Sequence, residues 1–585
     1  MKTATSEQPT LELDQRVLEA SDYLRTCLRI PELDFPIKAR YAIASEQEVL
    51  HPIIHNNDVI AIVGAFYGDE GKGKLIDAVA HHPLIQLIMR ANGGENAGHT
   101  VFLNGVEYIF HLTPSAILVP DKTCLIGQNC EIDPLTFMPD EIQPLQKEGI
   151  SLDKLFIGNA HIVTPYHKLM DLIGNPKNTS TLRGMGPSHA SKAARKGLRL
   201  NDLYLSEKEQ ACYLLEDMRS YEGLLHTLSI SESELIDRCR ELNTSFKRIP
   251  DHVIQFLREK DKVSFLIDLY QKTVTTNSDF PKQVNSTQLL NETLEQGKKV
   301  LLEGSQARML SNAEGTCWRK STSADTTAAG LIAAAGYNPT KYGTAVINVA
   351  KFPSSKVGAG PNPTAYVPQN FFSSRNVETL DDIVDVCDDF DAIQKKFFES
   401  IRDNGTMFES TYTDKDGRTY AISAAMAIAS SRHHKERGAT TKKPRITGLF
   451  DCVVHHSVNQ AQGPLLAINA LDRGDDYDNV GITIAYIVYS PEGELTADGR
   501  TYKTGDIIKA GQPLPNETVL SKCYKIMRVL PGWKKTPLKN LKPTDPLPPE
   551  AEHYIGAIKL YTGADPISMG TGTGNKDIHY LKRTN

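Results

Sequence analysis

The stretch Val59-Ile60-Ala61-Ile62-Val63-Gly64, followed closely by Gly68-Asp69-Glu70-Gly71-Lys72-Gly73-Lys74, decides the fold class. Its first part is a short, β-branched apolar run, which is typical of a strand buried on both faces of a sheet. Leu75, Ile76 and Val79 then follow at helical spacing. The order strand, glycine-rich turn, helix predicts an α/β fold with a phosphate-binding turn at the end of a central strand.

The turn resembles a P-loop in spacing but differs from it at one position. Gly68 and the pair Gly73-Lys74 are correctly spaced, but Leu75 stands where a P-loop carries the Ser or Thr that holds magnesium. Glycines allow backbone N–H groups to approach phosphate, and Lys72 and Lys74 add positive charge. We therefore expect a phosphate site of another kind, with a solvated surface loop as the alternative.

Composition limits the class of protein. The 585 residues are 40% apolar and 23% charged, with a formal net charge of −6, which is ordinary for a globular protein. Without a long Lys/Arg run, we expect no nucleic-acid partner and no membrane surface. The polar N-terminus shows no secretory signal, and nine cysteines without a C-x-x-C pair predict reduced thiols and a cytoplasmic location.

Further apolar runs indicate one large, mostly parallel central sheet with helical excursions and small hairpins. Asn104-Gly105 lies between two short apolar segments, which is a strong hairpin signal. The sequence from about 206 to 296 is polar and has helical periodicity. Residues 1–57 and about 366–435 are predicted to lie outside the core of the fold. The remaining predicted strands cover residues 84–89, 300–302, 344–350, 465–468 and 482–489.

A second glycine-rich segment, Gly93-Gly94-Glu95-Asn96-Ala97-Gly98-His99-Thr100, is predicted to be a flexible loop that leads into a strand. A lone histidine is more often structural than catalytic. A carboxylate such as Asp69 near His99 would, however, supply the base and the acid that proton removal coupled to phosphoryl transfer needs.

Several other polar segments are candidates, each with a simpler explanation. The loop Thr181-Leu182-Arg183-Gly184-Met185-Gly186-Pro187 precedes a cationic cluster that could be solvated surface. Glu303-Gly304-Ser305-Gln306 follows a strand, and the hydroxyl-rich residues 321–327 could merely cap a turn. The cations in Gly438-Ala439-Thr440-Thr441-Lys442-Lys443-Pro444-Arg445 suit a carboxylate-binding loop.

In this order the motifs resemble the adenylosuccinate synthetase family, whose members join IMP to L-aspartate with GTP. The resemblance runs from about residue 58 to 583 and also includes His111-Leu112-x-Pro114-Ser115, Val357-Gly358-Ala359-Gly360-Pro361 and Leu530-Pro531-Gly532-Trp533. It implies a single synthetase domain over 58–585, with an N-terminal extension over 1–57, an enlarged helical block over about 206–296 and an insertion over about 366–435.

The resemblance also implies catalytic roles. Asp69 would remove the N1 proton of IMP, His99 would assist from the opposite side, and Lys72 would neutralise charge on the transferred phosphoryl group. One Mg²⁺ would be held by Asp69 and Gly98, which explains why Leu75 is tolerated. The implied contacts to GTP are Gly68, Asp69, Glu70, Gly71, Lys72, Gly73, Lys74, Gly98, His99, Thr100, Arg445, Asp472, Ser568 and Gly570.

The other two substrates are assigned in the same way. The implied IMP contacts are Asp69, Asn96, Ala97, Thr181, Arg195, Gln306, Thr322 and Lys443, with Ser321 as the alternative to Thr322. The implied aspartate contacts are Val357, Ala439, Thr440, Thr441, Lys443 and Arg445. Arg195 would reach the site of a second subunit, so the family implies a homodimer.

This chain departs from the family at two places. Lys442-Lys443 stands where the family has Gly-Arg, and Ala470 stands where it has Lys. A lysine cannot reproduce a planar bidentate grip, and Ala470 loses a stem that packs on guanine, so affinity for aspartate and selectivity for GTP are expected to differ. Two alternatives stay open: a synthetase for a 2-amino purine nucleotide, against which Asp69 argues, and a non-catalytic GTP-binding regulatory homologue.

Overall fold

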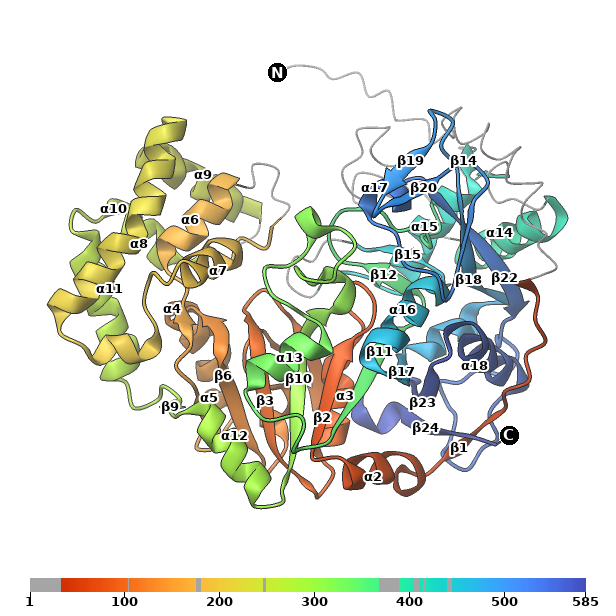
Figure 1. The fold of residues 1–585 in the computed structure, drawn as a ribbon, viewed down its shortest axis with the longest axis horizontal. Coiled ribbons are helices and arrows are strands. Elements are labelled where there is room, and N and C mark those ends of the chain that lie inside the picture. The colour runs from red at the N-terminus through yellow and green to blue at the C-terminus, as the bar shows by residue number, and fades with distance from the viewer. Residues whose placement is uncertain are drawn as a thin grey trace. The chain divides into compact units, whose positions relative to one another are not determined.

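The protein is described here from a computed structural model (Figure 1). The described residues are 33–103, 105–174, 180–245, 249–367, 389–404, 410–413, 417, 419–438 and 444–584. The chain divides into two compact units: unit 1 comprises Met1–Leu50, Gly64–Gly71 and Ile347–Asn585, and unit 2 comprises His51–Val63 and Lys72–Val346. Within the described residues, no helix has the length and apolar character that a membrane crossing needs.

Unit 2 contains a parallel sheet built on the predicted apolar runs. Its strand order is β2 (Val59–Gly64), β10 (Lys299–Ala307), β3 (Ile85–Gly94), β6 (Thr123–Ile132), β7 (Leu155–Ile157) and β9 (Lys282–Gln283), and β8 (His161–Ile162) also pairs with β6. Every residue of β2 is buried, as the uninterrupted apolar run predicts. The strands predicted over 59–63, 84–89 and 300–302 are confirmed.

Helices of unit 2 cover this sheet and extend beyond it. Helix α3 (Lys72–Ala80) directly follows the glycine-rich turn, and α12 (Ser286–Glu295) and α13 (Ala328–Ala335) pack on the strands. Figure 1 shows the remaining helices of this unit gathered in one bundle, which contains α6 (Pro165–Gly174) and α7 (Met185–Ala193). The bundle is completed by α8 (Glu207–Leu228), α9 (Glu232–Ser245), α10 (Asp251–Arg258) and α11 (Lys262–Tyr270).

The predicted hairpin is present. Strands β4 (His99–Leu103) and β5 (Val106–Phe110) pair antiparallel, with His99 opposite Phe110. Gly105 has φ +82°, the left-handed conformation that a tight hairpin turn needs and that glycine adopts without steric cost.

Unit 1 contains a second run of parallel strands: β11 (Thr344–Lys351), β17 (Leu465–Asn469) and β23 (Asp565–Gly570). Two antiparallel strands extend it, β24 (Ile578–Arg583) on β23 and β1 (Tyr41–Ala44) on β24. Helix α2 (Glu46–Asn56) follows β1 in the chain. The predicted α/β fold with a large, mostly parallel sheet is confirmed.

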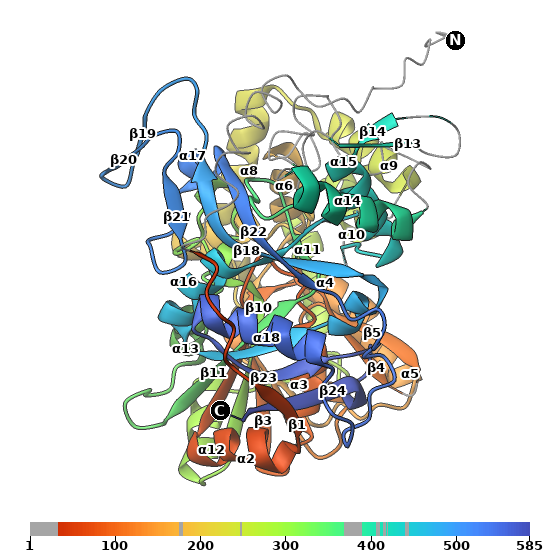
Figure 2. The same ribbon diagram turned by 90° about the vertical axis from the view of Figure 1, so that its right-hand side faces the viewer.

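A smaller sheet of unit 1 contains β16 (Phe450–Asp451), β18 (Asn479–Val488), β21 (Ile507–Lys509) and β22 (Cys523–Pro531), and Figure 2 shows β18 and β22 running side by side. Trp533 is fully buried, and a Cβ on Gly474 would lie 2.0 Å from its ring, so this tight contact requires glycine. The helices of this unit are α14 (Phe390–Asn404), α15 (Ile422–His433), α16 (Cys452–Gln462) and α18 (Pro549–Thr562).

Parts of two predicted loops are regular structure instead. Residues 93–94 belong to β3, because its pairing with β6 continues to Gly94 opposite Glu131. Residues 185–187, the end of the predicted loop 181–187, begin α7, and residues 303–306, which were expected to follow a strand, belong to β10. In each case backbone hydrogen bonds to a distant partner, or along a helix, override a local sequence that is rich in Gly and Ser.

Candidate active site

The turn between β2 and α3 has an unusual backbone. Gly68, Asp69 and Gly71 have φ of +92°, +58° and +76°. Glycine adopts these values readily, whereas a left-handed conformation costs a residue with a Cβ about 1–2 kcal/mol. A strained residue of this kind is common at functional sites, and here it is the residue with a predicted catalytic role, Asp69.

Two side chains hold the turn in this shape. The buried Glu70 carboxylate accepts hydrogen bonds from the backbone N–H of Phe66 (3.2 Å) and of Gly68 (2.7 Å). Asn469, the last residue of β17, donates from Nδ2 to the carbonyls of Glu70 (2.9 Å) and Gly71 (3.0 Å). The Glu70 side chain is therefore a structural brace of the turn.

Within unit 1, two residues predicted to bind aspartate, Arg445 and Val357, contact the turn that carries Asp69. Arg445 donates from Nε to Asp69 Oδ2 at 2.8 Å, and the Asp69 side chain is 25% exposed. The N–H of Val357 donates to the carbonyl of Tyr67 in the same turn at 3.1 Å. The carboxylate proposed as base and two residues proposed to bind aspartate therefore share one neighbourhood, while residues 439–443 lie outside the described structure.

In unit 2, the start of α3 packs tightly on the strand that carries His99. A Cβ on Gly73 would lie 2.9 Å from the Thr100 carbonyl and 3.3 Å from Cβ of His99, so this approach requires glycine. The side chains of Lys72 and Lys74 beside it are buried. The N-terminal turn of α3 and the charge of Lys72 thus lie close to His99, in an arrangement suited to phosphate.

His99 is held by a buried carboxylate that sequence reasoning did not assign to it. Glu303 Oε1 contacts His99 Nδ1 and also accepts from Ser115 Oγ at 2.8 Å and Arg90 Nη1 at 3.3 Å. Its second oxygen accepts from the Ser115 N–H at 2.8 Å. Arg90 and Glu303 are opposite each other on the parallel strands β3 and β10.

Electrostatics favours a neutral imidazole beside an ionised carboxylate. Burial first, and then the Arg90 charge, lower the pKa of His99. Burial alone would raise the pKa of Glu303, but His99, Arg90 and the Ser115 N–H outweigh it and lower that pKa. Within the described residues His99 Nε2 is buried and has no hydrogen-bond partner, so it is the nitrogen available to a ligand.

Unit 2 also contains four of the predicted IMP contacts: Asn96, Thr322, Gln306 and Ala97. Asn96 Nδ2 donates to Thr322 Oγ1 at 3.2 Å, whereas the alternative residue, Ser321, donates its hydroxyl to the Trp318 carbonyl at 2.8 Å. Gln306 has φ +44°, and its Oε1 is buried without a partner among the described residues. Ala97 keeps the loop turned by donating its N–H to the Gly94 carbonyl at 3.3 Å.

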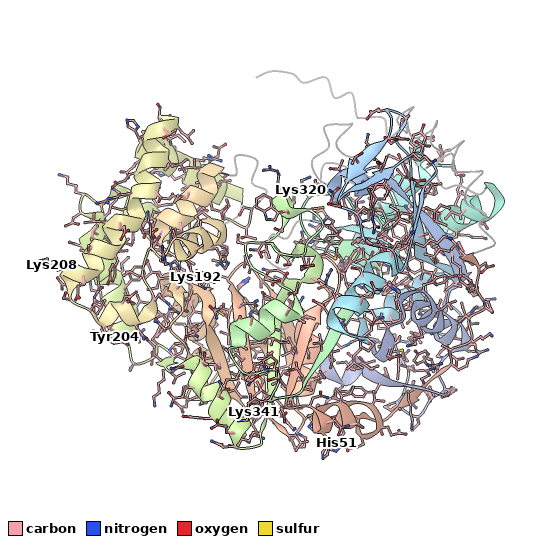
Figure 3. The ribbon with its side chains drawn as sticks, in the orientation of Figure 1. His51, Lys192, Tyr204, Lys208, Lys320 and Lys341 are labelled. Atoms are coloured by element: carbon pink, nitrogen blue, oxygen red, sulfur yellow. The ribbon has the colours of Figure 1, made fainter. Side chains whose placement is uncertain are left out.

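The cationic cluster that follows residue 181 lines a cavity of about 450 Å³. Lys192, Arg195, Lys196 and Arg199 contribute to its wall, and Figure 3 labels Lys192 at the end of α7. Arg195 has φ +61°. The cluster is therefore a shaped concave surface, and Thr181 precedes it as a partly exposed residue.

The predicted guanine contacts lie in unit 1, at the ends of neighbouring strands. Asp472 follows β17 in a short 3₁₀ helix, η10 (Leu471–Asp476), and Ser568 and Gly570 belong to β23, which pairs with β17. Ala470 precedes this helix with φ +56°. Arg473 pairs with Glu436, which also pairs with Lys351 at 2.6 Å, so a buried ion network supports the turn.

Sequence reasoning missed several supporting residues. Glu303 and Ser115 lie in motifs of the sequence, but nothing in the sequence pairs them with His99, which is 204 residues before Glu303. Asn469 and Glu436 carried no signal, since single polar residues at strand or helix ends are common. Their partners are defined only by the fold.

The fold and these side chains define a class: an α/β enzyme that acts on a nucleotide, with an acidic residue inside a phosphate-binding turn. The chain belongs to the adenylosuccinate synthetase family, whose model matches residues 61–579.

Known relatives agree with this assignment. The chain is 45% identical to adenylosuccinate synthetase of Trypanosoma brucei brucei, over 99% of both chains. It is also 45% identical to that of Leishmania infantum, over 99% of this chain and 84% of the relative. The fold is similar to fully ligated adenylosuccinate synthetase from Plasmodium falciparum, with a TM-score of 0.61 and 24% identity over 89% of this chain and 99% of the other.

Proposed function

We propose that this chain joins IMP to L-aspartate to form adenylosuccinate, with GTP converted to GDP and phosphate through 6-phosphoryl-IMP. This is the first committed step from IMP to AMP. The observation that carries the proposal is the carboxylate of Asp69, which is held in a strained phosphate turn and bound to Arg445 at 2.8 Å. A turn that only bound phosphate would not need an acid at this position.

In the first step Asp69 takes the N1 proton of IMP, and the 6-oxygen attacks the γ-phosphorus of GTP while the bond to the β–γ bridging oxygen breaks. The neutral His99 holds its Nδ1 toward Glu303, so Nε2 is the nitrogen that faces a ligand. Lys72 offsets the negative charge of the transferred group.

In the second step the amine of aspartate attacks C6 and inorganic phosphate leaves with the 6-oxygen. Val357 and Arg445, beside the turn, and Ala439, Thr440, Thr441 and Lys443 would bind the aspartate carboxylates. Arg445 is the bidentate donor of this set, because lysine at position 443 offers only a point charge.

Magnesium is part of the proposal. Its preferred ligands are hard oxygens, and the Asp69 carboxylate, which is 25% exposed, and the Gly98 carbonyl have that chemistry. When bound together with phosphate oxygens, Mg²⁺ would neutralise the β- and γ-phosphates. The Asp69–Arg445 ion pair would then be exchanged for the metal contact.

The IMP contacts are proposed to be Asp69, Asn96, Ala97, Thr181, Gln306, Thr322 and Lys443. The bond between Asn96 and Thr322 favours Thr322 over Ser321, whose hydroxyl is committed to its own turn. Arg195 would serve the site of a second subunit in a homodimer.

For GTP we propose two groups of contacts. The phosphates would meet residues of the two glycine-rich segments and Arg445, and Glu70 would contribute only its backbone, because its carboxylate braces the turn. The guanine would meet Asp472, Ser568 and Gly570, at the ends of β17 and β23.

The test is one mixture of GTP, IMP, aspartate and Mg²⁺, followed for adenylosuccinate. Wild-type protein should form product, and Asp69→Asn should slow it by about 10²–10⁴-fold, the usual contribution of a general base. Asp153→Asn, at an exposed position, is the matched control and should keep full activity. No product from the wild type would refute the ligase, and undiminished product from Asp69→Asn would refute the mechanism.

The same assay separates the two alternatives. A preference for dGMP over IMP would show a synthetase for 2-amino purine nucleotides. GTP binding without any turnover would show a regulatory homologue.

A further inference from the structure

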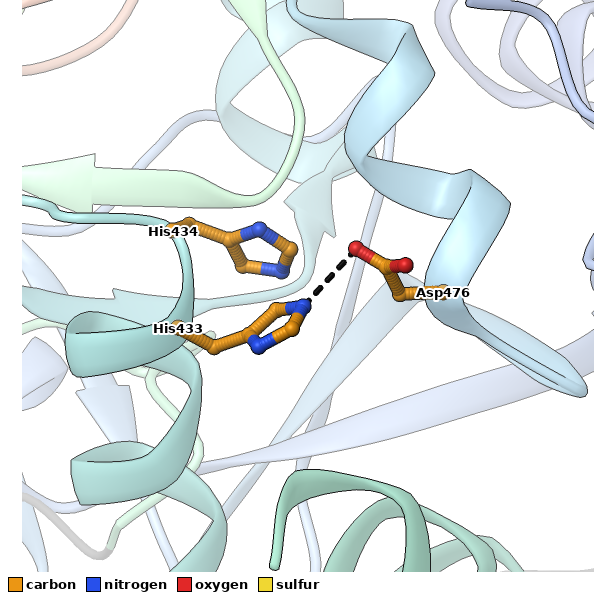
Figure 4. A group of neighbouring side chains, drawn as sticks. All are labelled: His433, His434 and Asp476. Atoms are coloured by element: carbon orange, nitrogen blue, oxygen red, sulfur yellow. Dashed lines mark hydrogen bonds and ion pairs between the residues drawn. The ribbon is translucent and has the colours of Figure 1, made fainter. Parts of the chain in front are cut away.

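Two histidines and an aspartate of unit 1, none of which has a proposed role in catalysis or substrate binding, lie close together. His433 is the last residue of α15, His434 follows it, and Asp476 ends η10. One nitrogen of each ring and one carboxylate oxygen of Asp476 all lie within 4.8 Å of one another. Figure 4 shows both imidazoles turned toward the Asp476 carboxylate.

We propose that His433, His434 and Asp476 bind a divalent transition-metal ion of the Zn²⁺ type. Two imidazoles and one carboxylate match the ligand sets of zinc sites, in which water completes the coordination. Nitrogen ligands favour Zn²⁺, Co²⁺ or Ni²⁺ over Mg²⁺, which prefers oxygen. The ion would join the end of α15, within the segment that departs from the family, to the helix η10 that also carries Asp472.

The surroundings orient the ligands in advance. The His433 ring stacks on Phe390 with centroids 4.3 Å apart and planes 3° from parallel. Its Nε2 lies 2.8 Å from Asp476 Oδ2, and His434 Nε2 lies 3.1 Å from the Tyr477 hydroxyl. A metal ion would replace these two hydrogen bonds.

Only a small rearrangement is needed. Ligand atoms of a tetrahedral zinc site are about 3.4 Å apart, given Zn–N and Zn–O bonds of about 2.1 Å. The most distant atoms must therefore approach somewhat, and His433 and Asp476 can move because their side chains are 39% and 47% exposed. His434 is buried and forms the fixed wall of the site.

Neighbouring charges are largely compensated. Arg473 and Lys351 repel a cation near His434, but both pair with Glu436. Lys534 pairs with Asp391 at 2.7 Å.

The site is tested on the full chain, stripped of metal with a chelator and titrated with Zn²⁺ in the absence of nucleotide and Mg²⁺. The wild type should bind one Zn²⁺ per chain, and His433→Gln and Asp476→Asn should each weaken binding by at least about tenfold. His226→Gln, which removes an exposed histidine in α8, is the matched control and should bind as the wild type does.

Two further measurements make the result decisive. Co²⁺ should give the visible absorption of a nitrogen-ligated ion in the wild type and in His226→Gln, but not in the two ligand variants. Zn²⁺ should raise Tm by mass action only where it binds. The proposal is overturned if the wild type binds no stoichiometric Zn²⁺, if both ligand variants bind it equally well, or if millimolar Mg²⁺ displaces it.

Discussion

At the scale of single residues, Asp69 and Leu75 explain each other. A P-loop holds magnesium through a hydroxyl at the position that Leu75 occupies, and the leucine is buried here. In the proposed site, Asp69, whose φ is +58°, brings a hard oxygen into the turn. Backbone strain of this kind is common at functional sites, which supports the role proposed for the Asp69 carboxylate.

Glu303 is predicted to position His99. Glu303→Gln removes the negative charge at Nδ1 of His99, so kcat should fall by about 10²-fold or more. Because the Glu303 charge raises the pKa of His99, its loss should lower that pKa further and move the acidic limb of the rate profile to lower pH. Steady-state kinetics across pH measures both effects.

Ser115→Ala is the control for Glu303. It removes one hydroxyl group that donates to Glu303 at 2.8 Å but leaves the charges of Glu303 and Arg90 in place, so the acidic limb of the rate profile should not move. A loss of kcat in Glu303→Gln without any shift of the limb would mean that Glu303 only supports the fold.

The shape of the phosphate turn can be tested with two glycines of similar φ. Gly71→Ala should cost about 1–2 kcal/mol of stability and raise the KM for GTP, since the new Cβ would lie 3.2 Å from Asn469 Nδ2 and push this brace outward. Gly105→Ala has φ +82° but nothing within 4 Å, so it should lose similar stability and keep its KM. Equal KM changes in both variants would contradict this role of Asn469.

These residues also show how far sequence reasoning reaches. Asp69 and His99 could be predicted because their chemistry stands in short glycine-rich segments. Glu303 could not be paired with His99, since the contact depends on two parallel strands from distant parts of the chain. The Arg445–Asp69 pair spans 376 positions and is equally invisible without the fold.

At the scale of elements, the centres of strands were predicted well and their ends poorly. A β-branched apolar run such as 59–63 predicts a buried strand without any knowledge of its partners. The extension of β3 through Gly94 is decided by pairing with β6, and Gly93 is required there because a Cβ would lie 2.5 Å from Ser305 Oγ. A local reading of the same glycines indicates a loop.

Strand β1 is predicted to protect the edge of unit 1. The edge strand β24 is covered by β1, and the Tyr41 N–H donates to Glu552 at 3.1 Å. Deleting residues 1–44 should lower Tm and promote aggregation through the exposed edge of β24. It should also raise the KM for GTP, because β24 pairs with Ser568 and Gly570. Thermal unfolding, light scattering and GTP kinetics measure these effects.

Lys582→Ala is the control for this deletion, because it changes a side chain of β24 but leaves β1 in place. It breaks only an ion pair with Glu48 in which both side chains are largely exposed, at 58% and 49%, so stability should change little. If the deletion lowered Tm no more than this variant does, β1 would not be needed to protect the edge of β24.

The smaller sheet of unit 1 is predicted to gain stability at alkaline pH. Lys525 on β22 is buried, and burial lowers its pKa to about 7 from the ordinary 10.5. The unfolded chain therefore binds more protons than the native chain between pH 7 and 10.5, so stability rises with pH in that window. Lys525→Met should remove this rise, a difference of roughly 2 kcal/mol between pH 7 and 9.

Unfolding measured by denaturant at pH 7 and at pH 9 checks this. Lys503→Met, at an exposed lysine of the same unit, should leave the pH dependence unchanged. A wild-type stability that is flat across this window would show that Lys525 keeps its proton when buried.

At the scale of the whole molecule, the structure consists of two compact units. Neither unit is one continuous stretch, since unit 1 takes Gly64–Gly71 from the middle of unit 2. Strand order and this interleaving follow from long-range pairing, which composition and periodicity do not encode. A single synthetase domain over 58–585 stays a prediction.

The last prediction concerns the homodimer. If Arg195 completes the site of a second subunit, activity per chain depends on association and should fall on dilution below the dimer dissociation constant. Arg195→Leu should raise the KM for IMP and leave the KM for GTP almost unchanged, because its cationic cavity, with Lys192 and Lys196, suits an anionic group. Lys208→Leu, a cation on the exposed start of α8, is the control. Activity per chain that stays constant while sedimentation shows monomers would mean that each chain completes its own site, and Arg195 would then have to act within its own subunit.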